Sequence, residues 1–177
     1  MSTTHSVQDR RQLVGTRWRL DPSGSSAEFR VPNFWGLASV KGRLQRLDGW
    51  LEVDGDDQWR MELTLDAASL DTGNRRRDRH LRSADFFDVQ HHPEVRFRSS
   101  SVNDHGGGRL HVEGELEAAG ERARLQLEAT VEHADGGLDL DAAATVDQRQ
   151  LGMTYSPLRM VRTPTALSVH ARLRRER

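Results

Sequence analysis

The chain has 177 residues, a length that suits one domain with its own hydrophobic core. Its 26 Lys and Arg residues nearly balance 27 Asp and Glu residues, and the formal net charge of -1 argues against nucleic acid as a partner. No cysteine is present, which excludes disulfides, thiolate nucleophiles and cysteine-ligated metals. There is neither a secretory signal nor an apolar run long enough to span a bilayer, so we expect a cytoplasmic protein without an integral membrane segment.

After a polar N-terminal arm over residues 1–15, the chain alternates apolar with polar residues, the period of half-buried strands. The clearest segment places Trp59, Met61, Leu63 and Leu65 on one face. The predicted strands are, in chain order, 18–21, 27–31, 40–53 with a break near residues 47–49, 59–66, 95–102, 110–117, 123–132, 138–146 and 167–173.

An apolar loop lies between the second and third predicted segments. Pro32 and Gly36 make it a poor regular strand. Its two aromatic residues, Phe34 and Trp35, form either a plug at one end of the sheet or the lip of a ligand entrance. We favour the lip, because two aromatic side chains in a loop are costly to expose without a partner.

Alternation is lost over residues 72–89, which predicts a short helical insert around residues 74–88. Ser83 is placed to cap a short turn of helix that runs through Phe86, and Phe86 and Phe87 would plug the space beneath the insert. The basic run from Arg75 to Arg82 either forms a solvated helix face or binds a phosphate group.

Short Gly- and Asp-rich turns separate the later strands, which predicts a meander of antiparallel hairpins. No long amphipathic helix is available to cover the sheet, so the sheet must close on itself or fold into a sandwich. In a barrel of about eight strands, the size of the inward residues decides whether the interior is filled or holds a ligand. Small residues on the inward face favour a hollow interior, unless they face the insert or a narrow end: Gly114, Ala123, Ala129, Ala142, Ala144 and Ala171.

The sequence disfavours two kinds of catalytic site. His80, His91 and His92 lie close in sequence and could hold a metal, but adjacent residues of an extended chain point apart and no ligand array accompanies them. Serines at 69, 83 and 99 lack the Gly-x-Ser-x-Gly turn of a nucleophile elbow.

Several strings resemble the YceI-like family, in that family's order along the chain. The most specific is the segment 68–89, ASLDTGNRRRDRHLRSADFFDV, followed by HPEVRFRS at 92–99. Weaker ones are WRLD at 18–21 with Phe29, VKGRL at 40–44, VEGEL at 112–116 with Gly120, and VDQRQLGM at 146–153. The chain departs from the family at GSSAEF, 24–29, where a His-Ser pair is usual, and at Glu117, where a Thr is usual.

The resemblance implies an all-β fold, an extended lipocalin-like antiparallel β-barrel of about eight main strands over residues 16–177, with His80 anchoring the insert. It also implies a non-enzymatic protein without cofactor that sequesters or transports a polyisoprenoid or fatty-acid-like lipid in an apolar tunnel. The candidate lining consists of Phe29, Val31, Phe34, Trp35, Leu63, Leu65, Phe86, Phe97, Leu125, Leu127, Leu140 and Ala142. Two alternative functions stay open: a stress-related barrel with a dry core and no ligand, and a metal-dependent enzyme using His80, His91 and His92. A homodimer also stays open.

Overall fold

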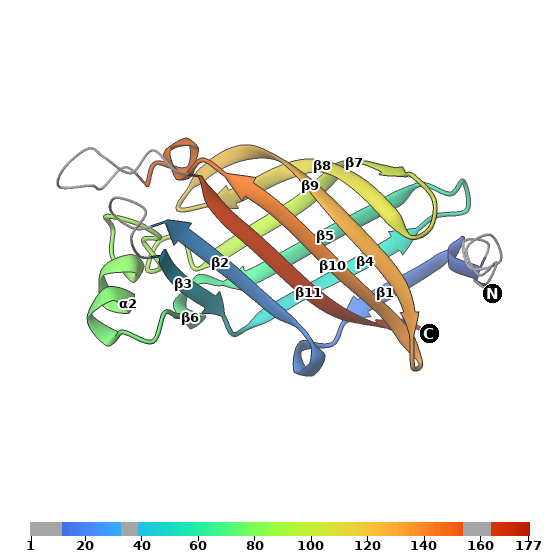
Figure 1. The fold of residues 1–177 in the computed structure, drawn as a ribbon, viewed down its shortest axis with the longest axis horizontal. Coiled ribbons are helices and arrows are strands. Elements are labelled where there is room, and N and C mark those ends of the chain that lie inside the picture. Colours follow the sequence, from blue (N-terminus) through green and yellow to red (C-terminus); the bar gives the residue numbers. More distant parts are fainter. Residues whose placement is uncertain (1–11, 33–38, 154–163) are drawn as a thin grey trace.

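The computed structural model describes residues 12–32, 39–153 and 164–177, and within them 11 strands form one antiparallel sheet (Figure 1). The strands are β1 Thr16–Leu20, β2 Ser26–Pro32, β3 Ser39–Leu44, β4 Leu47–Val53, β5 Trp59–Asp66, β6 Leu70–Asp71, β7 Glu94–Asp104, β8 Arg109–Ala118, β9 Glu121–Ala134, β10 Gly137–Val146 and β11 Thr165–Arg175. The helical elements are α2 Arg75–Arg82 and the 3-10 turns η1 Pro22–Gly24, η3 Ala67–Ser69 and η4 Gln148–Leu151. None of the helices in these described ranges is long and apolar enough to span a bilayer.

Eight of the strands close into a ring. They follow the order β1, β4, β5, β7, β8, β9, β10 and β11, and β1 pairs back with β11 through Trp18 and Arg175. This closure confirms the predicted antiparallel barrel, and it leaves the ring without free edges. The remaining strands, β2, β3 and β6, extend the sheet from β11 and lie with α2 at one end of the molecule, on the left in Figure 1.

The inside of the barrel follows from the period-two pattern. Buried and exposed residues alternate along β9 from Arg122 to Glu132, with every second side chain buried. Aromatic and aliphatic side chains from all eight ring strands share one hydrophobic cluster. Leu13, in the part of the predicted polar arm that the structure describes, is 5% exposed and belongs to that cluster.

One two-residue turn shows how the register is set. Ala118 of β8 pairs with Glu121 of β9, and the residues between them, Ala119 and Gly120, have φ values of 52° and 78°. Positive φ at both central positions matches the twist of a tight hairpin, in which the second position favours glycine. A Cβ on Gly120 would lie 2.7 Å from Cε1 of the His92 ring, which is too close for a side chain. The turn therefore also packs against the segment before β7.

Two local predictions were wrong. The break in the segment 40–53 falls at Gln45 and Arg46, before Leu47, because both backbone N–H groups donate to the Ser69 hydroxyl, each at 3.0 Å, and not to a neighbouring strand. Ser83 ends α2 instead of starting a helix: its backbone N–H and its hydroxyl both donate to the His80 carbonyl. The helix begins earlier, after Asn74, whose side chain accepts from two backbone N–H groups.

A corner at Asp21 divides β1 from β2, and both strands pair with β11. The Asp21 carboxylate accepts hydrogen bonds from the backbone N–H and hydroxyl of Ser23 and, at 2.6 Å, from Nε of Arg174. The Ser25 hydroxyl donates to the Asp21 carbonyl and accepts from the backbone N–H of Arg172. These contacts fix the corner against β11, where β1 meets Leu173–Arg175 and β2 meets Ala166–His170.

The Asp21 corner makes part of the stability acid-sensitive. The hydrogen bonds from the Ser23 hydroxyl, Arg174 and the Ser23 backbone lower the pKa of Asp21 from 3.8 to about 2. A carboxyl whose pKa is lower in the folded state stabilises the fold above its unfolded pKa, and this contribution is lost as the pH falls through the folded value. We therefore expect Asp21→Asn to be less stable than the parent at about pH 6, with the difference shrinking as the pH falls toward and below about 2. Urea unfolding of both proteins across this pH range checks the prediction. A stability difference between them that does not change with pH contradicts it.

Candidate functional site

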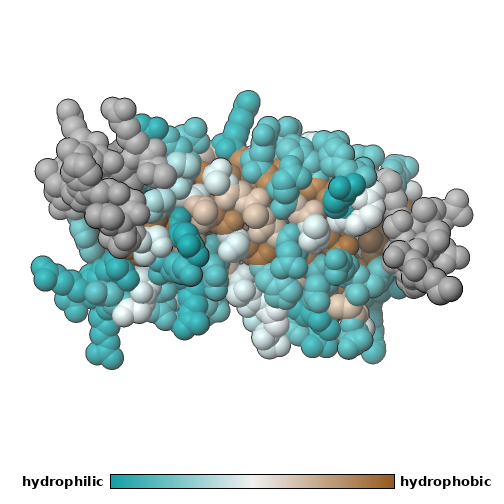
Figure 2. Space-filling model, in the orientation of Figure 1, coloured by the Kyte–Doolittle hydropathy of each residue, from teal (hydrophilic) through white to brown (hydrophobic). Residues whose placement is uncertain are grey.

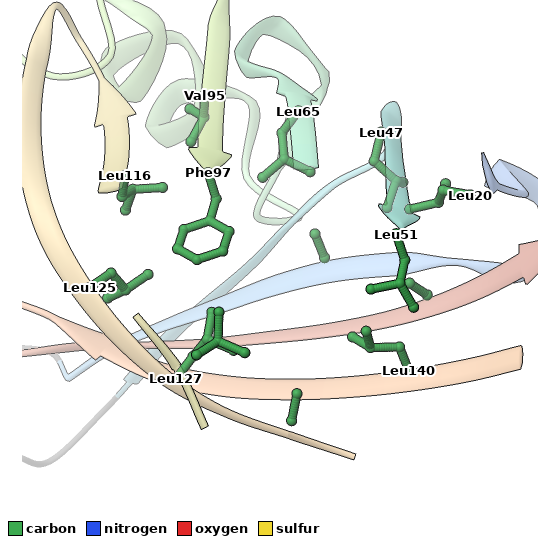
Figure 3. Close-up of a cluster of buried hydrophobic side chains, with 14 of the residues drawn as sticks. Leu20, Leu47, Leu51, Leu65, Val95, Phe97, Leu116, Leu125, Leu127 and Leu140 are labelled. Carbon is green, nitrogen blue, oxygen red and sulfur yellow. The ribbon is translucent and has the colours of Figure 1, made fainter. Parts of the chain in front are cut away.

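A cavity of about 410 Å³ lies inside the barrel. Its wall is mainly aliphatic and aromatic, with side chains from opposite sides of the barrel facing one another (Figure 3). In that view the Phe97 ring projects toward the strands that carry Leu125, Leu127 and Leu140. A volume of this order is typical of a small-molecule site, which spans roughly 300–1,000 Å³.

The cavity occupies only part of the interior. The other part is filled by buried side chains that do not belong to the cavity wall, and we call it the filled end: Leu13, Trp18, Val53, Trp59, Val112 and Leu138. Val53, Val112 and Leu138 are fully buried there. The filled end lies on one side of the cavity, and the cavity wall includes residues of β2, β3 and α2.

Ten of the twelve residues in the predicted lining belong to the cavity wall: Phe29, Val31, Leu63, Leu65, Phe86, Phe97, Leu125, Leu127, Leu140 and Ala142. The other two, Phe34 and Trp35, lie outside the described residues. The strand periodicity brings nine of them together because alternate residues of each strand face the interior, and Phe86 joins them from the turn that follows α2. That they bind a ligand stays a prediction.

The small inward residues fall into two groups. Ala142, Ala144 and Ala171 line the cavity, as expected for residues that leave space. Gly114, Ala123 and Ala129 are not part of its wall, so for them the interpretation as hollow space was wrong. At Gly114 the reason is direct: a Cβ would lie 2.6 Å from two ring atoms of Phe97 and 2.3 Å from the Arg98 carbonyl oxygen.

Gly42 is a second glycine whose missing side chain leaves room for an aromatic ring. A Cβ on this β3 residue would lie 2.2 Å from Cζ of Phe29 and 2.9 Å from Cγ2 of Thr72. The absence of a side chain at Gly42 leaves room for the Phe29 ring, which belongs to the cavity wall.

The end of the cavity near β6 is covered by α2 and the turn that follows it, and we call it the α2 end. Its wall includes Arg77, His80, Leu81, Phe86 and Phe87. The prediction named only Phe86 from this group as lining. The missed signal is the helical spacing of positions 77, 80 and 81, which puts three side chains on one face of α2.

The basic run does not behave as one solvated face. Arg75, Arg76 and Arg79 are exposed, whereas Arg77 and Arg82 are half-buried. The Arg77 guanidinium donates from Nε to the Thr72 hydroxyl at 2.8 Å and from Nη2 to the Thr72 carbonyl at 2.9 Å. Arg82 donates to the Leu70 carbonyl. The helix is thus anchored to the β6 segment by two of its arginines, while the other three face water.

The three histidines considered as metal ligands have different neighbours. His80 Nε2 lies 3.3 Å from Asp85, His91 Nδ1 lies 2.9 Å from Asp88, and His92 packs on Gly120. Within the part of the chain that the structure describes, no group of three or more His, Asp or Glu side chains is placed to hold a metal ion.

A second, open depression of about 550 Å³ lies on the outer surface over β2, β9, β10 and β11. Small residues such as Ala143 and Ser168 form part of it, and apolar residues show between hydrophilic ones over this face in Figure 2. Its acids are largely paired: Asp141 lies 2.8 Å from His170 and Glu128 lies 2.6 Å from His111. We assign no ligand to this depression.

Comparison with known sequences gives one consistent relationship. A family model described as a YceI-like domain matches residues 18–173. A UPF0312 protein of Vibrio cholerae is 33% identical over 114 residues, which are 62% of this chain and 60% of that protein. A UPF0312 protein of Serratia proteamaculans is 32% identical over 116 residues, 63% of this chain and 59% of that protein. The match therefore spans about 60% of the length of these curated relatives.

Solved structures share the fold at low sequence identity. BcnA of Burkholderia cenocepacia matches with a TM-score of 0.77 and 18% identity, over 86% of this chain and 98% of that one. A polyisoprenoid binding domain from Saccharophagus degradans, described as implicated in plant cell wall breakdown, matches with a TM-score of 0.70 and 12% identity, over 90% of this chain and 98% of that one. At these identities the likeness establishes the barrel fold.

Proposed function

The chain belongs to the YceI-like family, and from this membership and the apolar cavity we propose that the barrel binds a long-chain amphiphile, a polyisoprenoid or a related lipid, for sequestration or transport. The observation that carries the proposal is the cavity itself: its wall is mainly apolar, and the polar side chains in it include Glu28, Glu62, Arg77, His80, Gln148, Thr165 and Ser168. The fold neighbour described as a polyisoprenoid binding domain supports the choice of ligand class.

Binding of such a ligand requires few polar contacts, because burial of its apolar chain supplies most of the binding free energy. Burial of apolar chain contributes roughly 0.8 kcal/mol per CH₂ group, so ten buried carbons contribute on the order of 8 kcal/mol before the cost of ordering the ligand. This cost is several kcal/mol, and useful affinity therefore requires most of the chain to be inside the barrel. Chain length, more than any single contact, would then select the ligand.

The alternatives receive less support from the described residues. A barrel without a ligand would be expected to fill its interior, whereas the interior here is filled at one end only. The metal-dependent enzyme would need His80, His91 and His92 to converge, and each lies beside a different partner. We therefore propose a binding protein. A homodimer and a cytoplasmic location stay predictions.

The proposal is tested by what the protein carries and what it takes up. We expect organic-solvent extraction of the purified chain, followed by mass spectrometry, to release a molecule with a long apolar chain. After removal of that molecule, matched C10, C15 and C20 isoprenoid alcohols should raise the melting temperature increasingly with chain length. If no apolar molecule is released and none of the three alcohols, offered in excess, shifts the melting temperature, the binding function is refuted.

A further inference from the structure

The cavity and the filled end meet within the barrel, and filled-end residues lie directly beside residues of the cavity wall. Trp18 pairs in register with Leu51 of the wall, and Leu138 pairs with Leu173 of the wall. Leu138 has no exposed surface, so no space that water could enter touches it. We call this boundary the floor of the cavity and define it by three large filled-end side chains: Trp18, Trp59 and Leu138.

Two tryptophans supply most of the bulk of the floor. Trp18 and Trp59 are 7% and 8% exposed and belong to the same hydrophobic cluster. The Trp18 indole N–H donates to the Thr16 hydroxyl at 2.7 Å, which holds the ring in place. Trp59 lies two residues before Met61 of the wall, and its buried indole N–H has no hydrogen-bond partner among the described residues. Because an unpaired buried donor is destabilising, the property that this position gains from tryptophan is volume.

The length of the cavity above the floor follows from β11. The wall residues of this strand run from Thr165 to Leu173. At about 3.3 Å per residue they span roughly 26 Å along the strand, and a strand tilt of about 40° leaves about 20 Å along the barrel axis. Carbon–carbon bonds of about 1.5 Å at about 111° advance an extended chain by roughly 1.25 Å per bond. An isoprene unit adds four main-chain carbons, so about four units, a C20 chain, span the cavity.

We propose that the floor sets the length of the chain that the cavity accepts, with Trp18 and Trp59 as its specificity-determining residues and about four isoprene units as the limit. This inference deepens the proposed function and rests on it. Each carbon that enters the cavity adds to binding through burial, whereas carbons beyond the limit stay outside the wall and add little. The affinity therefore rises with chain length until the chain reaches the floor, and then stops rising.

Isoprenoid alcohols of C10, C15, C20, C25 and C30 test the limit by competition binding to the delipidated protein. We expect the affinity of the parent to rise at least about tenfold per unit up to C20 and to change by less than about threefold from C20 to C30. In Trp18→Ala and in Trp59→Ala, the space opened in the floor should admit a fifth unit. C25 should then bind these two variants at least about tenfold more tightly than C20 does.

A change in the opposite direction and a control complete the test. Ala171 lies on the wall two residues before Leu173, about one isoprene unit above the floor. Ala171→Trp should therefore lower the limit to C15 and weaken the binding of C20 at least about tenfold. The control is Leu13→Ala, which truncates a buried filled-end residue outside the strands and should keep the limit at C20.

Each outcome separates the two proposals. If the affinity of the parent keeps rising through C30, the inference is refuted while the binding function stands. If the parent stops at C20 but Trp18→Ala, Trp59→Ala and Ala171→Trp all leave that limit unchanged, the assignment to the floor is wrong. If no alcohol of the series binds, the proposed function itself fails. Melting curves of each variant without ligand identify loss of folding, and Ala171→Trp, which removes no packed side chain, keeps the test available if the floor variants do not fold.

Discussion

Ala142→Trp is expected to weaken amphiphile binding about a hundredfold while the barrel stays folded. Ala142 lines the cavity from β10, and an indole at this position would occupy much of the space that we assign to the ligand. Excluding about four CH₂ groups from the cavity removes roughly 3 kcal/mol of burial, which corresponds to a loss of affinity of about a hundredfold. Isothermal titration with an isoprenoid alcohol or phosphate measures this loss.

The control for this variant is a tryptophan on the outer face of the same strand. Thr145 is exposed and does not belong to the cavity wall, so Thr145→Trp should bind the ligand as the parent does. The melting temperature of ligand-free Ala142→Trp should lie near or above that of the parent, because the indole fills empty space. Undiminished affinity in Ala142→Trp would show that the ligand is not bound in this cavity.

Leu138→Ala is expected to cost much more stability than Leu140→Ala, although the two residues share one face of β10. Leu138 is 0% exposed at the filled end, and Leu140 is 7% exposed on the cavity wall. Truncation of a fully packed leucine leaves a new void and costs about 4 kcal/mol. At the cavity wall some partner atoms are already missing, so we expect a loss of about 2 kcal/mol or less.

Urea unfolding of the delipidated proteins measures both losses, and the lipid must be absent because a ligand that binds only the folded state adds to the apparent stability. The pair is internally controlled, since strand, residue type and substitution are identical. Equal losses at the two positions would mean that the interior is packed uniformly and would contradict the division into a cavity and a filled end.

The strands and their inward faces could be predicted from the sequence because burial on one side of a sheet forces a period of two. Leu125 and Leu127 of β9, for instance, are assigned to the interior by alternation alone, and both line the cavity. That the sheet closes on itself or folds into a sandwich could also be predicted, since no helix long enough to cover the sheet was available. The extra strand β6 was missed because two residues are too few to show any period.

The division of the interior could not be predicted, because it depends on what faces each residue across the barrel. Ala129 and Ala142 are both alanines and directly paired in register, yet only Ala142 belongs to the cavity wall. Gly114 reads as empty space in the sequence, but its position is taken by the Phe97 ring from the neighbouring strand. The basic run that contains Arg77 was predicted either to form a solvated helix face or to bind a phosphate group, and helical phase was the only clue that Arg77 lines the cavity.

The pairing of β1 with β11 also bears on how the protein is made. The ring is closed by strands from opposite ends of the described chain, with Trp18 beside Arg175. During synthesis the sheet stays open until β11 has left the ribosome, so two strand edges and the apolar inner face are exposed to other chains for most of that time. Non-local pairing of this kind folds slowly. We therefore expect the nascent chain to depend on chaperones, and a molecule with a long apolar chain that is present as β11 docks could be enclosed at that moment.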